Sequence, residues 1–211
     1  MNILIYDTPP GIAYFAASVL RRRGFRVAVT KDPEEARLRI DTALFDAVIL
    51  GPSGAPRSLA DFIEQEFPRL PVILAGVPAE RPPSGQLAAV LPAPLSAERL
   101  ISTLRFLERR RRERLAGLPV SLLQEGIALS CRLADLDGNT LMLAGESDEL
   151  QRHFGGDSRR VRVSVLGLSL EGVAAPDRCV SGPGCRLNVQ LDPPGAGELL
   201  RRLRKEPLPS S

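Results

Sequence analysis

The stretch FDAVILGPSGAP, residues 45–56, predicts a buried strand followed by a loop. Four consecutive apolar residues, AVIL, lead directly into Gly51. A short apolar run bounded by turn residues is typical of an interior strand of a parallel sheet, and the loops at the carboxyl ends of such strands often carry functional residues. Gly51 occupies that position here, and glycine supplies no reactive side chain.

The sequence around this strand alternates apolar runs with helical patterns. Such alternation over the first half of the chain predicts a doubly wound α/β domain with five parallel strands, because each crossover between parallel strands is right-handed. Asp32 and Pro33 predict a helix start, with the aspartate as N-cap and the proline in the first turn. The expected strands are 2–6, 25–30, 46–50, 71–76 and 88–94, and the expected helices are 11–24, 32–40, 58–67 and 96–117.

The pattern changes after Gly117. Strand-like stretches separated by glycine-containing turns follow, without intervening helices, and arginine alternates with valine within residues 159–175. This half-buried strand pattern predicts a small, mostly-β barrel that ends in a helix over 197–205. The expected organisation is a first domain over 1–107, an arginine-rich linker over 108–117, a barrel domain over 118–205 and a disordered tail over 206–211.

The composition excludes several classes of protein. The chain has 211 residues, 44% of them hydrophobic, with no Trp, one His, three Cys and a net charge of +3. A single histidine and the lack of a CxxC pair argue against zinc, and the cysteine count argues against a disulfide framework. The start shows no signal peptide and no apolar run is long enough for a membrane span, so we expect a cytoplasmic protein without membrane insertion. No nucleophile elbow or P-loop is present, so we expect no enzyme.

Five stretches of the first half carry a common pattern: ILIYDTPP, RRRGFRVAVTKDPEEA, FDAVILG, LPVILAG and AVLPAPLSAERL. They resemble the receiver domain of bacterial response regulators, and the resemblance covers residues 1–108. It implies a flavodoxin-like fold. In that family an aspartate ends the third strand and accepts a phosphoryl group, two acidic residues after the first strand hold Mg²⁺, a Ser or Thr ends the fourth strand, and a Lys precedes the proline after the fifth.

The residues at these positions predict a degenerate phosphorylation site. Asp7 is followed by Thr8 where the acidic pair stands. Gly51 replaces the acceptor, Gly76 or the preceding Ala75 replaces the hydroxyl residue, and Ala93 replaces the lysine. Phosphoryl transfer to a carboxylate needs a nucleophilic oxygen, a metal and a cation on the developing charge. The resemblance therefore implies a pseudo-receiver. In a shifted alignment, Ser53 or Asp61 would act instead.

The stretch LERRRRERLAG, from residue 107, places five arginines in six positions. Guanidinium groups match phosphate oxygens and stack on bases, which favours an anionic nucleotide as partner. Two alternatives remain open. The arginines are a solvated helix end, where cations are favourable, or they contact nucleic acid or an acidic protein.

This segment resembles the entry to a PilZ domain, the cyclic-di-GMP-binding β-barrel of bacteria. Arg110 and Arg114 match its RxxxR signature, which implies that they clamp phosphates. RLADLDGNTLML, residues 132–143, partly matches the second signature, DxSxxG, with Asp135 present, Asp137 in place of the serine and Thr140 in place of the glycine. The stretch GLSLEG, residues 167–172, is a rival match.

Together the two resemblances imply a non-enzymatic bacterial signalling protein. It would bind a protein partner through the receiver surface, with a homodimer as a further option in that family, and cyclic-di-GMP through Arg110, Arg114, Asp135 and Asp137. No other cofactor is expected. One alternative is a ligand-independent adaptor for motility or surface machinery. A DNA-binding response regulator is a second alternative, but no helix-turn-helix pattern follows the receiver-like half.

Overall fold

The computed structural model describes residues 1–6, 8–43, 45–52, 56–76, 87–145, 147–154, 157–176 and 185–205. The chain forms two compact units. Among the described residues, the first consists of Met1–Arg110 and Arg201–Lys205, and the second of Arg111–Leu200. The tail over 206–211, predicted to be disordered, lies outside the described residues.

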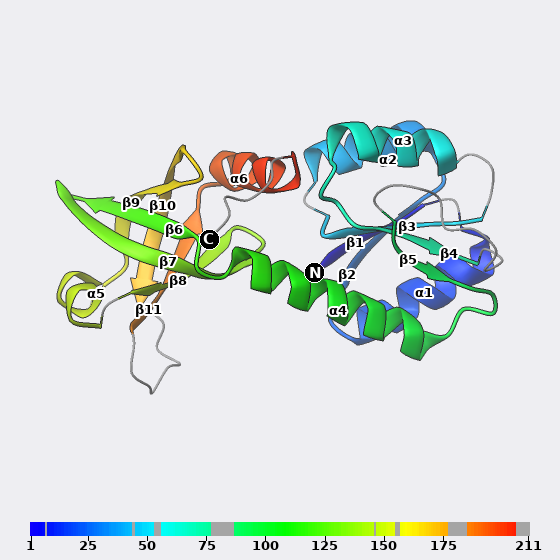
Figure 1. Ribbon diagram of the computed structural model, residues 1–211, viewed down its shortest axis with the longest axis horizontal. Coiled ribbons are helices and arrows are strands. Elements are labelled where there is room, and N and C mark those ends of the chain that lie inside the picture. The colour runs from blue at the N-terminus through cyan, green and yellow to red at the C-terminus, as the bar shows by residue number, and fades with distance from the viewer. Residues whose placement is uncertain are drawn as a thin grey trace. The chain divides into compact units, whose positions relative to one another are not determined.

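The first unit is built on a five-stranded parallel sheet with the strand order β2-β1-β3-β4-β5 (Figure 1). The predicted doubly wound α/β fold is therefore confirmed. The apolar run that ends at Gly51 is β3, which pairs with β1 on one side and β4 on the other. The strands are β1 (Asn2–Tyr6), β2 (Arg26–Thr30), β3 (Ala47–Leu50), β4 (Val72–Ala75) and β5 (Leu87–Leu91).

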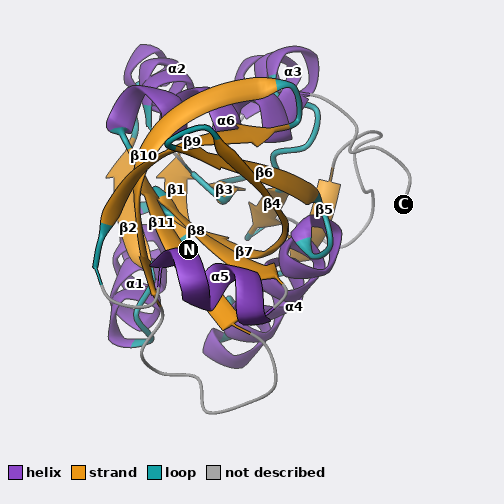
Figure 2. Ribbon diagram, turned by 90° about the vertical axis from the view of Figure 1, so that its left-hand side faces the viewer, coloured by secondary structure: helices purple, strands orange, loops and turns teal. Residues whose placement is uncertain are grey.

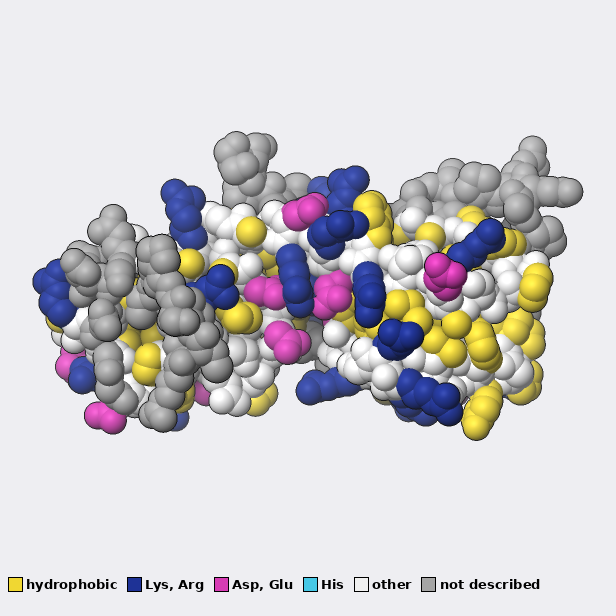
Figure 3. Space-filling view, turned by 90° about the horizontal axis from the view of Figure 1, so that it is seen from below, with side chains coloured by type: hydrophobic (Ala, Val, Ile, Leu, Met, Phe, Trp, Pro, Cys, Tyr) yellow, Lys and Arg dark blue, Asp and Glu magenta, His cyan; other side chains and the backbone are white. Residues whose placement is uncertain are grey.

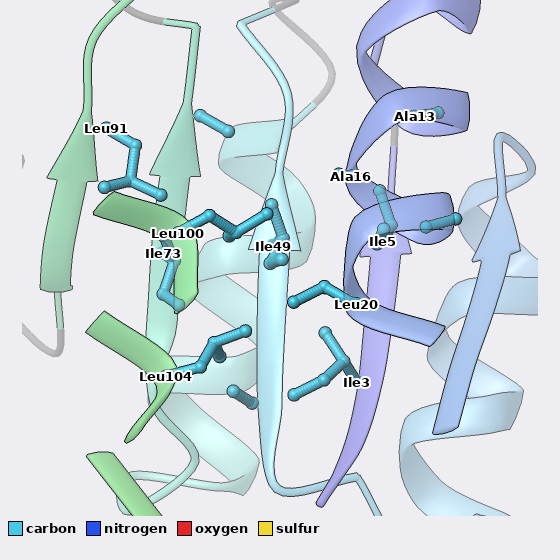
Figure 4. Packing of buried hydrophobic residues seen from close by; sticks show 13 residues of the cluster. Ile3, Ile5, Ala13, Ala16, Leu20, Ile49, Ile73, Leu91, Leu100 and Leu104 are labelled. Carbon is cyan, nitrogen blue, oxygen red and sulfur yellow. The ribbon is translucent and has the colours of Figure 1, made fainter. Parts of the chain in front are cut away.

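Helices cover both faces of this sheet. Ile3, Ile5 and Ile49 point to the face covered by α1 and α4, where they pack against small residues of α1 and leucines of α4 (Figure 4). The residues that alternate with them along the strands, such as Leu4 and Val48, point to the face covered by α2 and α3. The helices are α1 (Pro10–Arg22), α2 (Pro33–Thr42), α3 (Pro56–Glu66) and α4 (Ala97–Leu115).

The start of α2 confirms the expected cap. The Asp32 side chain accepts a hydrogen bond of 2.9 Å from the backbone N–H of Glu34, and Pro33 is the first helical residue. This carboxylate satisfies one of the donors that a helix start leaves unpaired. The helix therefore begins where the sequence predicts it.

The second unit contains a closed six-stranded antiparallel barrel, with the order β10-β11-β8-β7-β6-β9 (Figure 2). The predicted small β-barrel is confirmed. Burial alternates along the strands, as in β9, where three valines point inward and the intervening arginines and serine are exposed. The strands are β6 (Pro119–Gln124), β7 (Ile127–Asp137), β8 (Thr140–Gly145), β9 (Arg159–Val165), β10 (Leu168–Pro176) and β11 (Cys185–Leu191).

Two expectations about the second half need correction. A helix, α5 (Ser147–Phe154), lies between β8 and β9, so the prediction of strands without intervening helices is wrong. It buries Leu150 and Phe154, an apolar spacing of four residues that stabilises a helical turn against the barrel. The alternating stretch over 159–175 forms two strands joined at Leu166 and Gly167, both with positive φ.

The chain passes between the two units within two helices. The first passage is at Arg110 and Arg111 of α4, and the second is at Leu200 and Arg201 of α6 (Pro193–Lys205). The arginine-rich segment over 108–117 is therefore helical up to Leu115. No helix among the described residues is long and apolar enough to cross a membrane.

Candidate functional site

The first candidate site lies at the carboxyl ends of the sheet strands. Thr8, Gly51, Gly76 and Ala93 follow β1, β3, β4 and β5, which are neighbours in the sheet. The parallel arrangement therefore brings these residues to the same edge, where ligands bind in open α/β sheets. Asp7, the acidic residue predicted to accompany them, lies outside the described residues.

None of these four residues supplies a carboxylate or a cation. Gly51 is buried, and its N–H donates to the carbonyl of Tyr6 at 2.9 Å, so its backbone belongs to the sheet. Thr8 is 4% exposed, and its hydroxyl has no hydrogen-bond partner among the described residues. The position before Pro94 is exposed and carries only the methyl group of Ala93.

Apolar side chains occupy the space beside Gly76. A Cβ added to this glycine would lie 3.3 Å from Cδ1 of Ile12 and 3.8 Å from the ring of Pro52. Gly76 also has a φ of +78°, a conformation that residues with a side chain adopt only under strain. A serine or threonine hydroxyl, as a receiver carries after its fourth strand, does not fit here without local rearrangement.

Of the two residues of the shifted alignment, only one lies in the described part of the chain. Asp61 is an exposed residue of α3, and Ser53 lies outside the described residues. Asp46 precedes β3, where its carboxylate accepts a hydrogen bond of 2.7 Å from the N–H of Asn2. Because this contact lies at the amino ends of β1 and β3, Asp46 is at the edge opposite Gly51.

One carboxylate near the end of β2 is electrostatically distinct. The Thr30 hydroxyl donates a hydrogen bond to Glu35, and Arg39 donates to the same carboxylate at 2.6 and 2.9 Å. These bonds stabilise the charged form and hold the pKa of Glu35 below its ordinary value. Both oxygens of Glu35 therefore accept hydrogen bonds from neighbouring side chains.

Among the described residues, no cluster of three or more His, Cys, Asp or Glu could hold a metal ion.

The second candidate site is the arginine segment at the end of α4. Arg110 and Arg114 are exposed and four residues apart, so they lie on the same side of the helix. The guanidinium carbons of Arg109 and Arg110 lie over the half-exposed ring of Phe106, at 5.9 and 5.3 Å from its centroid. Figure 3 shows basic and acidic side chains close together on one face of the molecule.

The two arginines between the predicted pair contact the barrel. Arg111 donates from Nη2 to the carbonyl of Leu136 at 2.8 Å, and Arg112 forms an ion pair with Asp135, with 3.0 Å between Nε and Oδ2. The other oxygen of Asp135 accepts from the N–H of Leu136 at 2.8 Å. Asp135, predicted to bind cyclic-di-GMP, is therefore paired with Arg112, a residue that the sequence motifs did not single out.

A bulge in β7 explains where Asp135 points. The register against β8 shifts between Leu133 and Asp135. Up to Leu133 the buried residues of β7 are at odd-numbered positions, and the next buried residue is the even-numbered Leu136. Without the extra residue, the strict alternation of a strand would turn Asp135 into the barrel. The bulge instead leaves its side chain 17% exposed and within reach of Arg112.

The remaining motif residues lie at separate places of the barrel. Asp137 is exposed and pairs with Thr140 across the β7–β8 turn, in which Gly138 has a φ of +58°. In the rival motif, Ser169 is exposed on β10, whereas Gly172 faces the backbone of β11, where an added Cβ would lie 2.7 Å from the carbonyl oxygen of Gln190. Gly172 is thus required for strand packing, which accounts for it without a ligand.

Comparisons with known proteins give similarity in structure only. No family model matches the chain, and no curated protein matches it. NtrX from Brucella abortus has a TM-score of 0.45 at 22% identity, covering 55% of this chain and 31% of that chain. A two-component response regulator from Clostridium difficile gives 0.47 at 19% identity over 52% of this chain and 97% of its own. The pseudo-receiver domain of the CikA protein gives 0.43 at 24% over 50% of this chain and 95% of its own.

Proposed function

We propose that the protein is a non-enzymatic signalling protein whose first unit is a receiver-like domain that cannot be phosphorylated and that binds a protein partner. The observation that carries this proposal is the chemistry at the sheet edge. Gly51, Gly76 and Ala93 follow three adjacent strands, and none offers an oxygen nucleophile or a cation. The strand order β2-β1-β3-β4-β5 is that of flavodoxin-like folds, in which this edge is the functional one.

A phosphorylation assay tests the first part of this proposal. The full chain is incubated with acetyl phosphate and Mg²⁺, with a receiver that has an intact acceptor aspartate as positive control, and both are analysed by intact-protein mass spectrometry. We expect a phosphate adduct on the control only. An adduct on this chain that an Asp61→Asn or Ser53→Ala substitution removes would contradict the proposal and identify the acceptor of the shifted alignment.

The arginine segment supports a second function, binding of cyclic-di-GMP. The favouring observation is the placement of two exposed arginines, Arg110 and Arg114, on the helix that leads directly into a closed six-stranded barrel. Two features oppose it. Asp135 is already paired with Arg112, and the exposed carboxylate of Asp137 would repel an anionic ligand.

Calorimetric titration with cyclic-di-GMP decides whether this second function exists. The variants are Arg110→Ala/Arg114→Ala and, as a matched control with the same change in charge on the same helix, Arg105→Ala/Arg109→Ala. Binding that only the first variant loses would establish the nucleotide as an effector. Absence of heat and of a thermal shift at saturating nucleotide would contradict nucleotide sensing and leave a ligand-independent adaptor.

A further inference from the structure

The C-terminal end of α6 is bound to the first unit by a buried arginine. Arg204 is 8% exposed, and its guanidinium donates to the backbone carbonyls of Ala43 (3.3 Å) and Phe45, at the turn between α2 and β3. Burial of an arginine is unfavourable unless its donors are satisfied, and backbone carbonyls in a turn are fixed acceptors. This contact is therefore specific for the guanidinium geometry.

The backbone of the same residue makes a further contact. The carbonyl of Arg204 accepts a hydrogen bond of 2.9 Å from the N–H of Arg69, in the segment between α3 and β4. The last carbonyls of a helix have no partner within the helix, so an external donor at this position stabilises the helix end. Arg204 is thus held through both its side chain and its backbone.

The next residue adds a weaker contact. Nζ of Lys205 lies 3.2 Å from a carboxylate oxygen of Glu66 and 5.4 Å from the centroid of the Phe67 ring. Both partners of the ion pair are about half exposed, so this pair contributes little affinity but favours a basic residue. The surface formed by the Ala43 and Phe45 carbonyls, Glu66, Phe67 and the Arg69 N–H is called here the α6 socket.

We infer that the α6 socket is a peptide-binding site for a helix that ends in Arg-Lys, and that the end of α6 is its resident ligand. A carbonyl pair matches the planar fork of arginine, which a lysine ammonium does not reproduce. The acidic and aromatic residues beside it match the lysine that follows. This inference does not depend on the proposed function.

Hydrogen exchange of the full chain tests the resident contact. The Arg69 amide reports occupancy, because its N–H donates to the Arg204 carbonyl. Arg204→Ala should raise the exchange rate of this amide about tenfold or more, since it removes two donated hydrogen bonds, each worth roughly a factor of five to ten. Arg204→Lys should lie in between, and Arg201→Ala, an exposed position on the same helix, should match the wild type. Equal protection of Arg69 in Arg204→Ala and Arg201→Ala would overturn the inference.

Binding in trans tests the socket itself. A labelled peptide of residues 193–205 is titrated into the full-length Arg204→Ala and Arg204→Lys variants, and fluorescence anisotropy and Arg69 exchange are followed. We expect binding that restores Arg69 protection, and about tenfold weaker binding of the same peptide with Arg204→Ala. Equal binding of both peptides, or no binding to either variant, would overturn the inference. The lysine variant keeps this test valid if the alanine variant does not fold.

Discussion

In the second unit, Arg112 of α4 is paired with Asp135 of β7, with 3.0 Å between Nε and Oδ2. The arginine side chain is 56% exposed and the aspartate side chain 17%, so one partner is solvated and the other is mostly enclosed. The pair joins the last turns of α4 to the strand that carries the bulge. This ion pair therefore involves the carboxylate of Asp135, which the sequence predicts to bind cyclic-di-GMP.

A double-mutant cycle should measure this pair. For Arg112→Ala, Asp135→Asn and the double variant, we expect a coupling free energy of about 0.5–1 kcal/mol in urea unfolding, because solvent screens the exposed partner. Asparagine keeps an acceptor for the Leu136 N–H, so the cycle isolates the ion pair. Strictly additive effects of the two substitutions would contradict the pairing.

Substitution of Gly76 should cost stability for two reasons. Gly76→Ala combines a positive φ with a contact of 3.3 Å to Ile12, whereas Gly24→Ala, at a φ of +85°, meets nothing within 4 Å. We expect a loss of about 1 kcal/mol for Gly24→Ala and about 2 kcal/mol for Gly76→Ala in thermal or urea unfolding. Equal losses would show that Ile12 moves aside without cost.

The turn between β6 and β7 should be improvable. Glu125 and Gly126 both have positive φ, 49° and 85°, between the paired residues Gln124 and Ile127. Asparagine tolerates this conformation better than glutamate, so Glu125→Asn should raise the unfolding free energy by roughly 0.5 kcal/mol. Glu125→Ala retains the unfavourable conformation and should give no gain. A gain from alanine equal to that from asparagine would point to loss of the charge as the cause.

The lowered pKa of Glu35 predicts a defined pH dependence. The Thr30 hydroxyl and Arg39 favour the ionised carboxylate in the folded state, so the stabilisation is fully present above the ordinary glutamate pKa. It is lost as the pH falls through the lower folded-state pKa. Thermal unfolding of the wild type and of Glu35→Gln should therefore differ most near neutral pH and converge in acid. A difference that stays constant down to acidic pH would contradict this assignment.

The sequence predicts the first unit well because its signals are local. Continuous apolar runs bounded by turn residues indicate interior strands, and Asp32 with Pro33 marks a helix start that the structure confirms. The barrel is also visible, because arginine and valine alternate along β9. The short helix α5 is not predicted, because eight residues are too few for a helical period to be recognised.

The contacts of the candidate sites are harder to predict because they depend on partners distant in sequence. The bulge that brings Asp135 to Arg112 has one local signal, a break in alternation where two residues separate Leu133 from Leu136. The Arg204 contacts have none, since their acceptors lie 159 and 161 residues earlier. Whether Arg110 and Arg114 bind a nucleotide stays a prediction.

The passage of the chain through α6 has a consequence for synthesis. The first unit is discontinuous, because the segment Arg201–Lys205 joins residues 1–110, which precede Arg111–Leu200 of the second unit. Phe45 and Arg204 are 159 residues apart, which a ribosome adding about 5–20 residues per second covers in roughly 8–30 s. The whole barrel is therefore translated after the early part of the first unit and before Arg204. The order of synthesis makes the Arg204 contact a late step of folding.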